Sequence, residues 1–178
     1  MRRMTGVVAS GRTLAFAIGL FFVGFLVHES AHLLVLHLIG GQGSLIVRPW
    51  RFATVDLTLP SLHVQPNPPL DTWRQAIMNF SGPAIAAALF ALSLRWIQTP
   101  DLRLAVEANV AILVFYAVTE TAYLLLWSTF HIDADLLVTP EFNYGVPLVI
   151  ILIAAAARGL TPGVRLAPEQ AETARAGS

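Results

Sequence analysis

The chain has 178 residues, of which 56% are hydrophobic and only 12% are charged; eleven arginines balance eleven acidic residues, and there is no lysine or cysteine. Soluble domains carry roughly 25% charged residues, so the composition excludes a cytosolic enzyme, a disordered chain and a nucleic-acid binder with a basic face. The absence of cysteine excludes a disulfide scaffold, a thiolate metal site and thiol catalysis. We therefore expect the lipid bilayer as a partner, and no nucleic acid.

Four apolar segments approach or exceed the roughly 20 residues that a helix needs to cross the hydrocarbon core of a bilayer. They cover residues 13–39, 76–97, 104–127 and 144–157, of which the last is short. The first run is too long for a signal peptide and shows no clear cleavage site, so we expect it to be retained. The sequence predicts an all-α membrane protein with about four transmembrane helices.

The arginines predict the orientation, because loops on the cytoplasmic side of a membrane retain positive charge. With the N-terminus inside, both termini are cytoplasmic and the loop at 128–143 lies outside. The inner side then holds Arg2, Arg3, Arg12, Arg95, Arg103, Arg158, Arg165 and Arg175, and the outer side holds Arg48, Arg51 and Arg74.

A polar stretch, residues 40–74, separates the first two apolar segments. Its runs SLIVRPW and ATVDLTL are rich in β-branched and aromatic residues and are followed by prolines, which predicts a short β-hairpin and an extended turn. Residues 1–158 are therefore expected to form one integral membrane domain. Residues 159–178 lack periodicity and are expected to form a polar, flexible tail.

The chemistry concentrates in HESAH, residues 28–32, inside the first apolar segment. His28 and His32 lie one helical turn apart, so both imidazoles project from one face and can bind the same metal ion, while Glu29 can reach a water on that metal. Zn²⁺ lowers the pKa of its bound water to about 7, and a neighbouring carboxylate can take the proton. The alternative is a polar helix interface in which the histidines bond to neighbours.

A catalytic zinc usually has three protein ligands, and the third is less obvious. His37 lies about 180° round the helix from His28, and His63 and His131 are expected to be surface residues. Asp133 and Asp135 follow the third apolar segment, but His32 lies roughly 10 Å below the end of its helix, so their segment must turn back toward the membrane. The alternative role of these two aspartates is a helix N-cap and a solvated neighbour.

Two glutamates lie within the third apolar segment. Glu107 and Glu120 are about 220° apart on a helix, so they cannot both face the metal. Glu120 lies at the depth of the metal, which leaves three roles open: bonding a ligating imidazole, replacing Asp133 as the third ligand, or pairing with an arginine or a backbone group.

These residues together resemble the compact branch of the site-2 protease family of intramembrane zinc metalloproteases. The resemblance rests on HESAH in an apolar segment, on SGPAIAAALFAL at the head of the second segment (Ser81, Gly82, Pro83), and on an aspartate after the third. It implies that His28, His32 and Asp133 bind Zn²⁺, that Glu29 is the catalytic base, and that a membrane-protein or peptide substrate is cleaved in or beside the bilayer. It gives no oligomeric state.

The sequence departs from this family at two positions. The family's aspartate is followed by glycine, whereas this chain reads HIDADLL, which leaves Asp135 as an alternative to Asp133. Ala86 stands where many relatives carry an asparagine, and Asn79, one turn before the Gly-Pro pair, is the candidate to replace it.

The sequence also suggests how a substrate could reach the metal, and it leaves other functions open. A peptide bond in a transmembrane helix must be unwound before cleavage, and the edge of the hairpin in residues 40–74 can hold an extended segment by strand addition. The main rival is a membrane metal transporter or carrier without peptidase activity. A di-iron hydroxylase needs more histidines than the two that converge, and a silent scaffold does not need Glu29.

Overall fold

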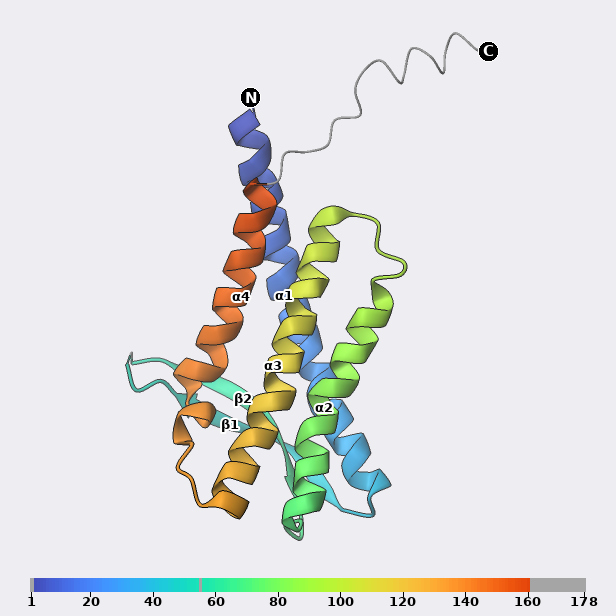
Figure 1. The fold of residues 1–178 in the computed structure, drawn as a ribbon, viewed down its shortest axis with the longest axis vertical. Helices are drawn as coiled ribbons and strands as arrows, with labels where there is room; N and C mark the ends of the chain where they lie inside the picture. The colour runs from blue at the N-terminus through green and yellow to red at the C-terminus, as the bar shows by residue number, and fades with distance from the viewer. Residues whose placement is uncertain (1, 55, 161–178) are drawn as a thin grey trace.

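The structure is a computed structural model that describes residues 2–54 and 56–160. Four helices, one hairpin and a short 3₁₀ helix follow one another along the chain (Figure 1). The elements are α1 (Arg2–Leu38), β1 (Gly43–Arg51), β2 (Thr58–Pro66), α2 (Thr72–Ser93), α3 (Pro100–Phe130), the 3₁₀ helix η1 (Asp135–Val138) and α4 (Pro140–Leu160).

The predicted class is confirmed: the chain is mostly helical, with a small antiparallel sheet between α1 and α2. All four helices are long and apolar enough to cross a membrane. The fourth helix is longer than predicted, because it begins at Pro140. Its first turn contains the polar residues Glu141 and Asn143, so hydropathy alone does not include this turn in the apolar segment. It also includes Gly159 and Leu160, which were predicted to begin the tail; residues 161–178 of that tail lie outside the described residues.

The outer surface of the helices is apolar. No more than 39% of the residues in each membrane-length window are buried, and large side chains such as Phe22, Leu89 and Ile153 are exposed. Exposed tryptophans mark the helix ends, with Trp73 at the start of α2 and Trp96 just after its end. Apolar flanks with tryptophan near the ends are the surface that lipid contacts.

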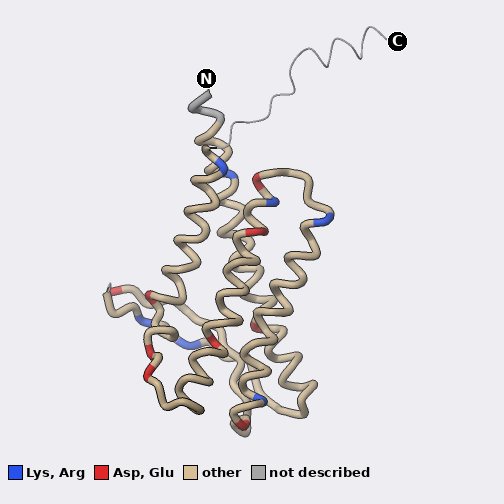
Figure 2. The backbone as a smooth tube through the Cα atoms, in the orientation of Figure 1, with Lys and Arg blue, Asp and Glu red and all other residues tan. Residues whose placement is uncertain are grey.

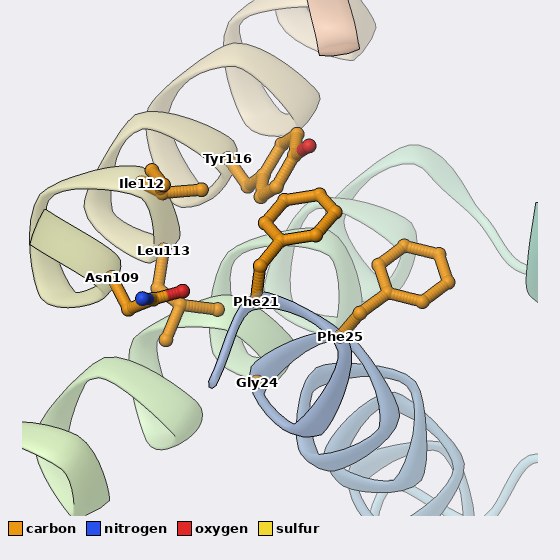
Figure 3. A pocket seen from close by; sticks show the side chains of 7 residues that line it. All are labelled: Phe21, Gly24, Phe25, Asn109, Ile112, Leu113 and Tyr116. Carbon is orange, nitrogen blue, oxygen red and sulfur yellow. The ribbon is translucent and has the colours of Figure 1, made fainter. Parts of the chain in front are cut away.

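Helices α1 and α3 form the centre of the bundle, with α2 and α4 on either side (Figure 1). Small residues allow the close approach: Ala17 and Ala105 are fully buried between the helices. Figure 3 shows side chains of α1 and α3 facing each other around a gap too small for water, lined by Phe21, Gly24, Phe25, Asn109, Ile112, Leu113 and Tyr116. The amide of Asn109 ties the helices by donating to the carbonyl of Ala17 at 3.1 Å.

Strands β1 and β2 pair antiparallel, with Ile46 opposite His63 and Val47 opposite Leu62. The predicted second strand is wrong by several residues, because most of ATVDLTL forms the turn and β2 continues through Pro60. Proline is tolerated there since Pro60 lies opposite Pro49, at a pair where neither residue needs to donate to the other strand. At the tip, Glu141 of α4 accepts hydrogen bonds from the backbone N–H groups of Ala53 and Thr54.

Charged residues lie mostly toward the two ends of the bundle (Figure 2). At the end away from the hairpin, Asp101 is buried and binds Arg158 at 2.6 Å and Arg12 at 3.4 Å. This cluster joins α1, α3 and α4. The long uncharged middle of the bundle makes any ionisable group within it costly, unless that group has a partner or a function.

Candidate metal centre

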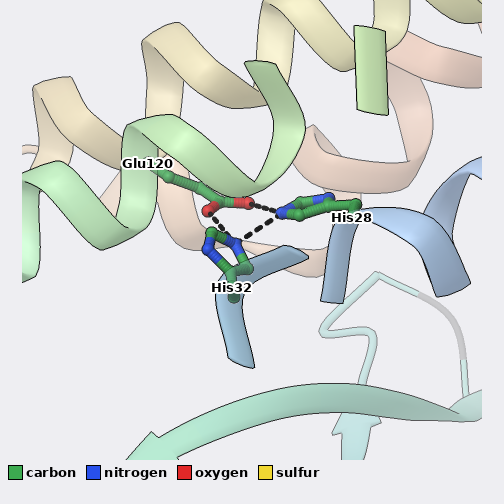
Figure 4. Close-up of side chains that lie close together, drawn as sticks. All are labelled: His28, His32 and Glu120. Carbon is green, nitrogen blue, oxygen red and sulfur yellow. Dashed lines mark hydrogen bonds and ion pairs between the residues drawn. The ribbon is translucent and has the colours of Figure 1, made fainter. Parts of the chain in front are cut away.

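His28 and His32 lie side by side on the face of α1 that packs against α3 (Figure 4). Both are buried, with 1% and 5% of their surfaces exposed, and their Nε2 atoms are 2.7 Å apart. The spacing of four residues in HESAH brings the rings together, as predicted from one turn of helix.

Glu120 of α3 completes the group. One carboxylate oxygen lies 3.4 Å from Nε2 of His28, and the other lies 3.3 Å from Nε2 of His32 (Figure 4). All three ligand atoms lie within 4.8 Å of one another, which is close enough to hold one metal ion. The Glu120 side chain is 30% exposed, against 2% and 6% for those of His28 and His32.

The second helix fixes the ring of His32. Its Nδ1 lies 2.7 Å from the carbonyl oxygen of Met78 in α2, so Nδ1–H donates there and Nε2 keeps its lone pair free for the cluster. This contact requires Gly82, because a Cβ at that position would lie 2.3 Å from the His32 ring. The glycine of the Ser-Gly-Pro motif therefore makes room for a candidate ligand.

Asn79, the next residue of α2, holds α3 at the position of Glu120. Its amide donates to the backbone carbonyl of Glu120 at 3.3 Å, and its own side-chain oxygen accepts from Gln75 at 2.7 Å. Pro83 has no N–H and leaves the backbone carbonyl of Asn79 without its helical donor. Adjacent residues of α2 thus hold both His32 and the backbone of Glu120.

His28 is held by packing. Its ring lies 6.1 Å from that of Phe25 and 5.8 Å from that of Tyr116, measured between centroids. The hydroxyl of Tyr116 donates to the carbonyl of Asn143 at 2.6 Å and so fixes the tyrosine against α4. Nδ1 of His28 is buried and has no hydrogen-bond partner in the described part of the chain.

Glu29 is 5% exposed and lies next to the cluster. Its carboxylate is near enough to His32 and Glu120 to interact with them electrostatically, and it lies beside the backbone of Val64 in β2. The hairpin therefore passes alongside the centre, and the carboxylate of the HESAH motif lies between α1 and β2.

Asp133 and Asp135 are not brought to the cluster. Helix α3 continues to Phe130 and ends on His131 in the left-handed conformation, with φ 54°, so the following segment leaves the bundle. Both aspartates are exposed, and Asp133 accepts a hydrogen bond from the backbone N–H of Asp135 at 3.0 Å. This bond is local to the loop, because the N-cap residue of η1 is Ala134 and no side chain caps that helix, so neither aspartate takes the N-cap role that the sequence left open. Glu120 occupies the place expected of the third ligand.

The other histidines differ in their surroundings. His37 is exposed and its Nδ1 bonds the carbonyl of Leu33 at 2.8 Å, away from the cluster as expected. His131 is exposed as well. His63 is half-buried, unlike the surface residue that the sequence suggested, and burial together with the charge of Arg48 lowers its pKa.

Comparison of the chain with protein-family models, with curated proteins and with solved structures found no match. The resemblance to the site-2 proteases therefore rests on the motifs, and the chemistry has to be argued from the cluster itself.

Proposed function

We propose that the chain is an intramembrane zinc metallopeptidase that hydrolyses a peptide bond in or next to a transmembrane segment of a membrane-protein substrate. One observation carries the proposal: two imidazoles and a carboxylate converge inside an apolar helix bundle, with Glu29 beside them. Ionisable groups at such a depth are costly and mark functional sites.

The donor set suits zinc. Two histidines and one glutamate are the ligands of a known class of catalytic zinc sites, which keep one position open. The bond from His32 to the Met78 carbonyl presents Nε2 to the ion in the right tautomer. We assign His28, His32 and Glu120 as the ligands, so that Glu120 takes the role that the family resemblance gives to Asp133.

In the proposed hydrolysis, His28, His32 and Glu120 hold the zinc and Glu29 transfers the proton. When bound, zinc would polarise the scissile carbonyl and acidify a water molecule. Glu29 takes a proton from the attacking water and later passes it to the leaving amine. Its carboxylate is buried beside the backbone of Val64 in β2.

The surroundings support a substrate in the membrane. The apolar outer faces of the helices fit a multi-pass protein, and the arginine positions favour cytoplasmic termini. The Glu120 side chain is partly exposed, and β2 packs on α1, the helix that carries both histidines.

The proposal is tested with Glu29→Gln and a matched control, Glu107→Gln, which changes an exposed glutamate of α3 paired with Arg103. The substrate is a reporter peptide: a leucine-rich single-span helix with two central glycines, which ease unwinding, and a donor and quencher at its ends. We expect Glu29→Gln to keep its zinc and lose cleavage, while Glu107→Gln cleaves like the wild type.

Two outcomes would count against a peptidase. Zinc-loaded wild type that leaves the reporter peptide intact in lipid nanodiscs contradicts the proposal. Zinc flux across vesicles that changes in Glu29→Gln, with no proteolytic product from the wild type, supports the rival transporter instead.

A further inference from the structure

Two amide side chains of α2, Gln75 and Asn79, join this helix to α3 at the residue that carries a candidate ligand. Nε2 of Gln75 donates to Oδ1 of Asn79 at 2.7 Å, and Nδ2 of Asn79 donates to the backbone carbonyl of Glu120 at 3.3 Å. The two amides are one helical turn apart and so lie on one face of α2. Because burying an amide is costly unless it is hydrogen-bonded, this pair needs the partner that α3 supplies.

The two buried apolar clusters of the bundle end before they reach Glu120. Among the described residues, α2 contributes none before Ala86 to either cluster, and α3 contributes none beyond Tyr116. Glu120 follows Tyr116 by one further turn of α3. The bond from Asn79 therefore joins α2 to α3 at a level that neither cluster reaches.

The carboxylate of Glu120 depends on its own backbone for its position. Within the described part of the chain, its hydrogen-bond and ion-pair partners are the imidazoles of His28 and His32 alone, at 3.4 and 3.3 Å (Figure 4). No third side chain orients it, so a shift of α3 moves the carboxylate relative to both rings. Groups in a functional site have to be held to within about 0.5 Å, which makes the position of this turn of α3 critical.

We propose that Asn79, held by Gln75, is a positioning residue that keeps Glu120 at the metal. The inference rests on the proposed role of Glu120 as a zinc ligand. Gln75 occupies Oδ1 of Asn79, which leaves the N–H groups of the same amide for α3. Asn79 bonds the backbone of Glu120, so it sets the depth and rotation of this residue without competing with the metal for its carboxylate.

Helix α2 thereby acts on ligands from both neighbouring helices. Met78 orients the ring of His32 from α1 through its carbonyl, and the next residue, Asn79, holds the turn of α3 that carries Glu120. Two adjacent residues of one helix thus set the separation of an imidazole and a carboxylate that come from two others. Loss of either contact is expected to act on the metal before it acts on the fold.

The experiment measures zinc affinity in competition with a chelator, for the full-length protein in lipid nanodiscs. It compares the wild type with Asn79→Ala, Gln75→Ala and a matched control, Asn109→Ala. The control is also an amide that donates to a backbone carbonyl of a neighbouring helix, that of Ala17 at 3.1 Å, but it lies roughly 16 Å from Glu120 along α3. We expect about tenfold weaker binding in Asn79→Ala, a smaller loss in Gln75→Ala, and wild-type affinity in Asn109→Ala.

A double variant shows whether Asn79 acts through Glu120. Residues that act through one another are not additive, so Asn79→Ala combined with Glu120→Gln should bind zinc no more weakly than Glu120→Gln alone. Co²⁺ in place of zinc gives a second readout, because its visible absorption depends on the number and arrangement of its ligands. We expect this absorption to change in Asn79→Ala and to stay unchanged in Asn109→Ala. The unfolding temperature of Asn79→Ala should stay close to that of the wild type, since one hydrogen bond between membrane helices contributes little to stability.

Three results would overturn the inference and leave the proposed function intact: wild-type zinc affinity in Asn79→Ala, additive losses in the double variant, or a higher KM for the reporter peptide with unchanged zinc affinity. The last result would assign the amide of Asn79 to substrate binding. Gln75→Ala, which leaves the bond between Asn79 and Glu120 in place, decides the test if Asn79→Ala does not fold. Wild-type zinc binding in Glu120→Gln contradicts the ligand assignment of the proposed function itself.

Discussion

The ligands of the candidate metal centre depend on backbone atoms and on one missing side chain. His32 is oriented by the carbonyl of Met78, and this contact exists because Gly82 has no Cβ to fill the space. A glycine inside a helix costs roughly 0.5–1 kcal/mol relative to alanine. The space that the His32 ring needs therefore comes at a small cost to the stability of α2.

This dependence gives a prediction for Gly82→Ala. The new methyl group would lie 2.3 Å from the ring of His32, so the ring must move and lose its bond to Met78. Loss of a partner that orients a ligand lowers metal affinity by about 10–100-fold. Competition with a zinc chelator measures this directly.

Gly19→Ala is the matched control, because it lies within α1 and a Cβ there meets nothing within 4 Å. We expect its zinc affinity to equal that of the wild type. Equal affinity in Gly82→Ala as well would show that His32 does not need its present orientation.

At the scale of elements, the hairpin presents one strand edge to the centre. Pro60 and Pro49 are opposite each other and cannot exchange hydrogen bonds, so the N–H groups of Leu62 and Val64, two and four residues further along β2, also point outward from the sheet. Val64 lies beside Glu29. Val47 is opposite Leu62, and its N–H points to the far edge of β1. An extended substrate segment that adds to β2 would therefore pass Glu29.

Proline substitutions at this pair test strand addition. Leu62→Pro removes an outward N–H from the edge near Glu29 without removing a bond between the strands, and Val47→Pro does the same at the far edge. A hydrogen bond contributes about 1 kcal/mol, so we expect kcat/KM for the reporter peptide to fall roughly 5-fold in Leu62→Pro alone. Zinc content should be unchanged in both. Equal cleavage by the two variants would exclude the β2 edge from substrate binding.

The hairpin also shows where prediction from the sequence stopped. Long apolar runs predicted the four helices, because helix length and hydrophobicity are local properties. The sequence misplaces the second strand because proline ordinarily ends a strand, whereas Pro60 is tolerated here through its pairing with Pro49. Pairing is a property of two strands together, which one run of residues does not reveal.

At the scale of the whole molecule, the packing of α1 against α3 determines which carboxylate lies beside His28 and His32 as the third candidate ligand. HESAH predicted His28, His32 and Glu29 from the spacing of a single helix. The third ligand comes from another helix, and its choice depends on the rotation and depth of α3, which place Glu120 at the cluster and leave Asp133 outside. The sequence contains one signal for Glu120, which is a carboxylate deep within an apolar helix. The family resemblance instead indicates Asp133 as the third ligand.

Zinc binding by isosteric variants tests the assignment of the centre most directly. We compare purified wild type with Glu120→Gln and Asp133→Asn, measuring zinc per chain and the affinity in competition with a chelator. The wild type should bind about one zinc, Glu120→Gln should bind at least about tenfold more weakly, and Asp133→Asn should match the wild type. Weak binding in Asp133→Asn with unchanged binding in Glu120→Gln would contradict a centre formed by His28, His32 and Glu120.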